Sequence, residues 1–266
     1  MIRTLKEPNS WDDLNRLLWQ KSFDSQTNKY RPYIAFRGLS RTYTKDLVTG
    51  IQRISRLRPL NLATLERRLL DTFRNYAQEH YPELRSDWEL LSLGRHYRLH
   101  TRLIDWTISP YVALFFATEN MEHWNRDGVV WCVSRKKTRD VLPAKLRRIL
   151  EEKGTYLFSA SLLQKKYADL ARLDNDKDLK ETMIWFEPAS ISPRIVNQYA
   201  LFSVMPGVES CQFKYFERNP GLAWRIPIPK RLKPEIYQRL EVMNLSHRTI
   251  YPGLDGIALW LNGYYA

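Results

Sequence analysis

The sequence is poor in cysteine and contains no long apolar segment. Cys132 and Cys211 are its only cysteines. Two are too few for a disulfide framework, and no CxxC pair of the kind found in common zinc sites occurs. The longest apolar run, residues 111–117, is far shorter than the roughly 20 residues that cross a membrane. The first residues also lack the apolar core of a signal peptide. We therefore expect a cytoplasmic protein with no membrane partner.

Positive charge and aromatic side chains, by contrast, are abundant. Lys and Arg total 42 against 29 acidic residues, a formal net charge of +13. Such an excess favours polyanionic partners, such as nucleic acid or phosphorylated small molecules. The basic residues are spread over segments 53–68, 136–153 and 230–239, and a solvated basic surface would give the same composition. Nine Trp, 15 Tyr and ten Phe supply enough apolar surface for a folded core.

Apolar spacing and capping residues predict a mixture of helices and strands. Helices are predicted at residues 10–22, 62–80, 86–96, 143–153, 234–243 and 252–262, and another begins at Pro110. Strands are predicted at residues 33–36, 128–134, 183–186, 195–204 and 223–228, with residues 99–107 as a connection. We therefore predict an α/β (α+β) fold in which one mixed sheet is flanked by helices. A single domain is expected over residues 1–266, with residues 1–28 as a helical lead-in.

The densest polar segment, residues 95–107, is embedded among apolar residues. It contains the imidazole of His96, the guanidinium of Arg102 and the carboxylate of Asp105. Buried polar groups must be paired, so this segment is either a functional site or a structural network in which Arg102 pairs with Asp105. His96 and His100, four residues apart, could share a metal with Asp105. Because no HExxH motif is present, we favour a site without metal.

This segment also carries a resemblance to a known family. The stretch LGRHYRLHTRLIDWTISPYVALFFA resembles the FRG domain, whose pattern runs approximately Gln-His-Tyr-Gly-Leu-Pro-Thr-Arg-Leu-Leu-Asp-Trp-Thr. The tripeptide Phe36-Arg37-Gly38 matches the one that gives the family its name, and GIQR, PRIVNQYALF and PGLDGIALWL match further segments. The resemblance spans about 11–261. The chain departs from the family at four positions, where Arg95, Arg98, His100 and Ala200 replace Gln, Gly, Pro and Gly.

The resemblance implies a chemistry. FRG proteins include members of toxin and anti-phage systems, and their order of parts is similar to that of Arg–Ser–Glu ADP-ribosyltransferases. It implies that NAD is the substrate and that Arg37 holds one of its phosphates, with Gly38 allowing close approach. The serine strand is loosely matched by residues 158–161. Gln198 stands near where a catalytic Glu is expected, so Glu187 or Glu209 would have to be recruited.

The resemblance and the residue types together give a set of expected roles. The catalytic candidates are His96, Arg102, Asp105 and Gln198, and the NAD-binding candidates are Arg37, Gly38, Tyr97 and Thr101. Asp105 would stabilise the ribosyl oxocarbenium ion, His96 would fix ribose hydroxyls, and Tyr97 would stack on nicotinamide. For Gln198, a buried amide at a strand edge is the structural alternative.

The expected function is that of a toxin-like or anti-phage defence enzyme. It would cleave NAD and transfer ADP-ribose to nucleic acid or protein, with an antitoxin or defence-system protein as a further partner. The alternative is a non-catalytic module that binds nucleic acid or a phosphorylated ligand. A metal-dependent nuclease is a poorer fit, because two-metal sites need several carboxylates and few lie near residues 95–107.

Overall fold

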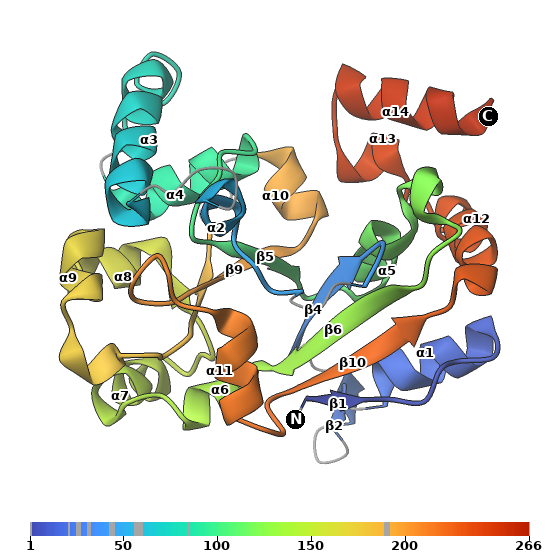
Figure 1. Ribbon diagram of the computed structural model, residues 1–266, viewed down its shortest axis with the longest axis horizontal. Coiled ribbons are helices and arrows are strands. Elements are labelled where there is room, and N and C mark those ends of the chain that lie inside the picture. The colour runs from blue at the N-terminus through green and yellow to red at the C-terminus, as the bar shows by residue number, and fades with distance from the viewer. Residues whose placement is uncertain are drawn as a thin grey trace.

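The computed structural model describes residues 2–20, 22–24, 28–30, 33–42, 46–55, 61–84, 86–188 and 192–265. Within these residues, eight strands form one mixed sheet in the order β1-β10-β6-β4-β5-β9-β8-β7 (Figure 1). They are β1 (Arg3–Thr4), β4 (Ile34–Leu39), β5 (Ile104–Thr107), β6 (Gly128–Ser134), β7 (Phe158–Ser159), β8 (Ile184–Glu187), β9 (Ala200–Val204) and β10 (Ala223–Ile228). The β1–β10 and β7–β8 pairs are parallel, and the other neighbours are antiparallel. β2 (Phe23–Asp24) and β3 (Lys29–Tyr30) form a separate two-stranded sheet.

Helices flank the sheet, so the predicted α/β class with a mixed sheet is confirmed. The α-helices are α1 (Trp11–Trp19), α2 (Gly50–Ser55), α3 (Leu62–Ala77), α4 (Asp87–His96), α5 (Pro110–Thr118), α6 (Arg135–Asp140), α7 (Ala144–Glu152), α8 (Ala160–Lys166), α9 (Leu170–Asp174), α10 (Pro193–Asn197), α11 (Gln212–Arg218), α12 (Lys233–Val242), α13 (His247–Ile250) and α14 (Leu254–Tyr264). Short 3-10 helices cover Met121–His123, Lys177–Leu179 and Lys230–Leu232. None of the helices in the described part of the chain is both long and apolar enough to cross a membrane.

The central strand β6 is buried on both faces, as its continuous apolar run predicts. Val130 and Cys132 belong to a cluster with α1, α5 and α12 on one face. Trp131 and Val133, the intervening residues, pack with Phe216 of α11 on the other face. A further cluster joins α3, α4, α7, α8 and α9 to β8 and β9. The first two clusters cover the two faces of the sheet around β4 and β6, and the third covers β8 and β9. β5 lies between β4 and β9, near the middle of the sheet.

Two predicted segments were wrong. Residues 99–107 are not merely a connection, because Ile104–Thr107 forms β5 inside the sheet. Residues 195–204 are not one strand, because Ser192 caps the short helix α10 and the strand begins only at Ala200. Between them, Tyr199 has φ +47°, a left-handed conformation that separates the helix from the strand. The strand predicted at residues 33–36 extends to Leu39 and so contains Arg37 and Gly38.

Candidate functional site

A pocket of about 470 Å3 lies where β4 and β5 separate. These antiparallel strands are paired through Phe36 and Thr107. Beyond this pair, the strands are joined by a side chain and not by a further backbone pair. NH1 of Arg37 on β4 donates to the backbone carbonyl of Asp105 on β5 at 2.5 Å. The ends of α4, α5 and α10 complete the walls. Strand separation therefore turns the middle of the sheet into a cavity that can admit a ligand.

The sequence places these walls through strong local signals. Ser86 and Glu89 form a capping box that begins α4, and this helix ends at His96 on the pocket wall. Ser109 caps α5, and Pro110 occupies its first turn. Both helix starts were predicted, and both are confirmed.

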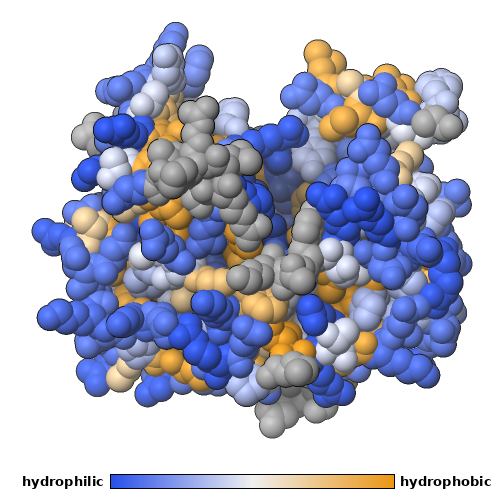
Figure 2. Space-filling view, in the orientation of Figure 1, coloured by the Kyte–Doolittle hydropathy of each residue, from blue (hydrophilic) through white to orange (hydrophobic). Residues whose placement is uncertain are grey.

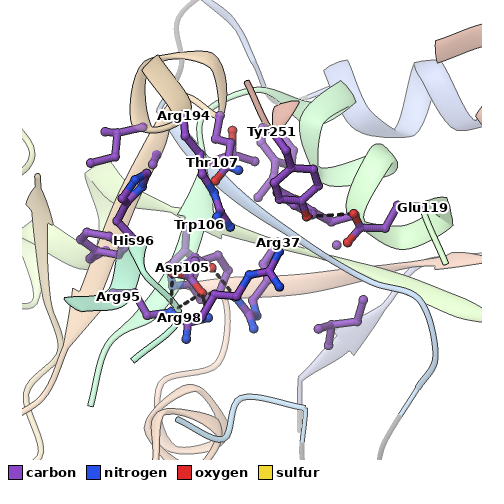
Figure 3. A pocket seen from close by; sticks show the side chains of 18 of the residues that line it. Arg37, Arg95, His96, Arg98, Asp105, Trp106, Thr107, Glu119, Arg194 and Tyr251 are labelled. Atoms are coloured by element: carbon purple, nitrogen blue, oxygen red, sulfur yellow. Dashed lines mark hydrogen bonds and ion pairs between the residues drawn. The ribbon is translucent and has the colours of Figure 1, made fainter. Parts of the chain in front are cut away.

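Positive charge dominates the pocket. Among the described lining residues, the guanidinium groups of Arg37, Arg95, Arg98 and Arg194 face only two carboxylates, those of Asp105 and Glu119. Figure 3 shows the Arg95–Asp105 interaction and the Tyr251–Glu119 interaction on different sides of the cavity. An excess of arginine in a concave site favours an anionic ligand.

Arg37 on β4 is a partly buried cation whose hydrogen bonding is incomplete. Besides its bond to the Asp105 carbonyl, its NH1 lies 3.6 Å from Oδ2 of Asp105. Its Nε has no hydrogen-bond partner among the described residues. Burial lowers the pKa of Arg37 to about 10, although the Asp105 charge opposes this shift. An unsatisfied buried donor costs about 1–3 kcal/mol, so Arg37 is held beside the pocket at some cost in stability.

Asp105 on β5 is held by Arg95. Nε of Arg95 donates to Oδ1 at 2.7 Å, and NH2 donates to Oδ2 at 2.5 Å. Burial opposes ionisation of Asp105, but Arg95 and Arg37 outweigh it and lower its pKa. Asp105 therefore stays anionic and orients two arginines toward the cavity. Arg95 stands where the FRG pattern has Gln, so this bidentate pair is a feature of the present sequence.

Arg98 occupies a strained position at the end of α4. Its φ is +64°, in the left-handed region that favours glycine, which the FRG pattern has here. The amide of Leu99 donates to Gly94 at 2.8 Å, and that of Arg98 donates to Arg95 at 3.1 Å. These two bonds form a Schellman motif. The loop thus keeps a glycine-type turn although the glycine is absent, and it presents the Arg98 guanidinium to the pocket.

Glu119, at the C-terminal end of α5, was missed by the sequence reasoning. Its Oε2 accepts a hydrogen bond from the Tyr251 hydroxyl at 2.9 Å. Burial raises the pKa of Glu119 to about 7, and this rise is limited by Tyr251 and by the charges of Arg194 and Arg98. A carboxyl group with that pKa can exchange protons near neutrality. One signal was available, because Glu119 follows the matched segment ALFFA at the end of an otherwise apolar helix.

Of the predicted site residues, five line the pocket: Arg37, Gly38, His96, Asp105 and Gln198. Burial lowers the pKa of His96, and the Arg194 charge adds to this effect. The imidazole is therefore neutral at pH 7. Gln198 donates from Nε2 to the Ile250 carbonyl at 3.2 Å, so it ties α10 to α13 and does not lie at a strand edge.

Gly38 is required by packing against α5. A Cβ at this position would lie 1.8 Å from the Ala113 carbonyl oxygen and 2.8 Å from the Ala117 nitrogen. The close approach that the glycine permits is therefore that of the α5 backbone. The sequence-based interpretation assigned this space to the ligand.

Arg102 does not join His96 and Asp105, so the prediction that these three side chains converge was wrong. Arg102 is buried, and its Nε donates to Oε2 of Glu66 at 2.7 Å while NH1 donates to Oδ1 of Asp174 at 2.6 Å. Residues three apart in an extended segment point to opposite sides, which separates Arg102 from Asp105. The alternative of an Arg102–Asp105 pair was wrong as well.

The remaining predicted residues lie outside the pocket lining in the part of the chain that the structure describes. Thr101 is buried, and its hydroxyl accepts from the Leu103 amide at 3.3 Å, a local turn contact. The hydroxyl of Tyr97 lies 2.9 Å from that of Tyr81. Ser159 caps α8 at the far edge of the sheet, and neither Glu187 nor Glu209 lines the pocket.

No described group of three or more His, Cys, Asp or Glu side chains is arranged to hold a metal ion.

Comparison of the sequence with known protein families finds a match within the first half of the chain. The model of the FRG domain matches residues 32–126. This segment, less than half of the chain, supplies Arg37, Arg95, Asp105 and Glu119, and the match supports the FRG resemblance for it. No curated protein and no solved structure matches the chain.

Proposed function

We propose that the pocket binds a nucleotide diphosphate of the NAD type and cleaves its nicotinamide–ribose bond, with Glu119 as the reacting carboxylate. The observation that carries this proposal is the pairing of two groups in one cavity. Arg37 is a partly buried, incompletely bonded cation, and Glu119 is a partly buried carboxyl group with a pKa of about 7. The cavity volume of about 470 Å3 lies within the range of small-molecule sites.

Arg37 is suited to hold the diphosphate. Its guanidinium is a planar fork that binds phosphate oxygens in a charge-assisted, bidentate manner. Asp105 fixes this fork from one side, and the guanidinium lines the cavity. Arg98 and Arg194 add positive charge to the same cavity. His96, as a neutral imidazole, is suited to hydrogen bonding with ribose hydroxyls.

Glu119 is suited to the bond-breaking step better than Asp105 is. When the C–N bond breaks, its electron pair leaves with nicotinamide, and positive charge develops on the ribose. An ionised Glu119 would stabilise that charge. The acceptor oxygen or nitrogen then bonds to the ribose carbon and gives up its proton, which Glu119 can take. Asp105, by contrast, is already neutralised by Arg95.

The competing function is ligand binding without catalysis. It is favoured by the fact that two predicted catalytic residues are already hydrogen-bonded within the protein, Asp105 to Arg95 and Gln198 to Ile250. Nicotinamide release from NAD, followed by chromatography, separates the two functions. We expect release by the wild type and a loss of about a hundredfold or more in Glu119→Gln. Binding of ADP-ribose without any release by the wild type would establish the binding module instead.

The biological setting of the proposal is that of a toxin-like or anti-phage enzyme, which the FRG resemblance implies. The acceptor would be a nucleic acid or a protein, and an antitoxin or defence-system protein would be the partner. Expression of the wild type should then slow growth of the host cell. Glu119→Gln, expressed to the same level, should relieve this effect. Equal growth inhibition by the two proteins would separate the toxicity from the proposed chemistry.

A further inference from the structure

The pocket opens into a second, larger cavity. This cleft of about 960 Å3 lies between the end of α4, the start of α10 and the α13–α14 segment. It shares His96, Arg98, Arg194 and Tyr251 with the first pocket. Figure 2 shows the hollow between the part of the molecule built by α3 and α4 and the part built by α13 and α14. A molecule seated in the cleft would therefore reach the proposed reacting groups.

Tyr97 forms an exposed aromatic platform on one wall of this cleft. Its side chain is 54% exposed, yet three neighbours fix the ring. The His96 ring meets it edge-on with centroids 4.8 Å apart, Phe73 lies 6.4 Å away, and the two tyrosine hydroxyls of Tyr97 and Tyr81 are 2.9 Å apart. A rigid, exposed ring loses little entropy when a flat group stacks on it.

The charge of the cleft favours a polyanion. Arg98 and Arg194 lie on the boundary with the first pocket, and Asp255 is the one carboxylate among the described lining residues. The charge of Arg98 acts on Glu119 across the first pocket, and the backbone of Arg98 is held in a strained conformation. A strained residue whose guanidinium forms no hydrogen bond with the described residues, and which lies beside a cavity, is a candidate for ligand contact.

We propose that this cleft binds single-stranded nucleic acid, as the acceptor of the group transferred in the adjoining pocket. The role of the nucleic acid as acceptor rests on the proposed function, whereas its binding in the cleft does not. An unpaired base would stack on Tyr97, and the neighbouring phosphates would contact Arg98 and Arg194. An aromatic platform beside arginines is the usual arrangement for single strands, because every base has a face to stack and every linkage carries a negative charge.

The test is direct binding of a fluorescent 12-nucleotide single-stranded RNA, without NAD, measured by anisotropy over a range of salt concentrations. Tyr97→Ala should weaken binding roughly fivefold to a hundredfold, the range for one base–aromatic stack. Tyr76→Ala is the matched control, since Tyr76 is 77% exposed on α3 and lines neither cavity. A duplex of equal length should bind more weakly, because its bases cannot stack on Tyr97.

Arg98→Gly gives a second test that does not endanger the fold, because glycine suits the local backbone. It should lower the slope of log affinity against log salt by about 0.7, the value for one phosphate contact on a single strand. Arg172→Ala, on a side chain that is 72% exposed on α9, is its control. The inference is overturned if Tyr97→Ala binds the RNA like the wild type, or if an oligoglutamate peptide binds as tightly as the RNA. RNA binding without nicotinamide release would refute the proposed function and support the proposed role of the cleft. Nicotinamide release without RNA binding would support the proposed function and refute the role of the cleft.

Discussion

The rate of nicotinamide release should depend on one ionisation, that of Glu119. Because burial raises its pKa to about 7, and because the ionised form is the one that stabilises positive charge, the rate should rise with pH through about 7 and level off above it. Glu119→Gln keeps the shape of the side chain and removes the charge. It should lower the plateau rate by about a hundredfold or more and abolish the step in the pH profile.

Tyr251→Phe tests the same ionisation through the partner of Glu119. The lost hydrogen bond joins the Tyr251 hydroxyl to Oε2 of Glu119 at 2.9 Å, and the tyrosine remains a donor because burial and Glu119 raise its own pKa. A hydrogen bond to a charged group contributes about 1.5–3 kcal/mol, which corresponds to roughly one to two pKa units. The midpoint of the profile should therefore move upward by about that amount, with the rate recovered at high pH.

Both effects would be measured as the rate of nicotinamide release from pH 5 to 10. Circular dichroism would establish that each variant is folded. A midpoint unchanged in Tyr251→Phe would show that this hydroxyl does not set the ionisation. Glu119→Gln acting at the wild-type rate throughout would remove Glu119 from the reaction.

Four further predictions concern stability, each measured by urea unfolding. Gly38→Ala should destabilise the protein by about 3 kcal/mol or more, because its Cβ would overlap the α5 backbone; a loss below 1 kcal/mol would refute the packing role. Arg102→Met should cost about 3–5 kcal/mol, because it leaves the carboxylate of Glu66 buried without its partner; Arg172→Ala is the exposed control. Arg98→Gly should stabilise by about 1 kcal/mol by relieving the left-handed strain, and a destabilised variant would contradict this. Glu119→Gln should become more stable than the wild type as pH rises, by up to about 3 kcal/mol at pH 8, because the folded-state pKa lies above the unfolded value. Between those two pKa values the folded wild type binds more protons than the unfolded chain, so the stability of the wild type falls as pH rises. A difference in the free energy of unfolding between the two proteins that does not change with pH would contradict this prediction.

Local signals in the sequence predicted much of the fold. The Ser86–Glu89 capping box and the Ser109–Pro110 helix start each depend on residues at most three positions apart, and the structure confirms both. The apolar run of β6 likewise predicted a central strand. β5 was missed because it is short and carries Asp105. For α10, the β-branched pair Ile195-Val196 favoured a strand, whereas the cap at Ser192 determines the outcome.

The candidate site was predicted less completely, because its pairings are not local. The resemblance brought Arg37, His96 and Asp105 to attention, and the structure places them in one pocket. Arg102, however, finds its partners 36 and 72 residues away in sequence, which no local pattern indicates. Glu119 acquires its raised pKa from burial in the folded protein, and the hydroxyl that limits this rise belongs to Tyr251, 132 residues later. Burial and distant partners decide both roles, and neither is visible in the order of residues.

The central claim is that the cavity between β4 and β5 holds a nucleotide diphosphate against Arg37. A crystal structure of the protein soaked with ADP-ribose tests it most directly, since this ligand keeps the diphosphate and ribose but offers no nicotinamide bond to break. The account predicts a diphosphate oxygen that accepts a hydrogen bond from the guanidinium of Arg37, with the ribose facing Glu119. An empty pocket at saturating ligand, or ADP-ribose bound away from Arg37, would contradict it.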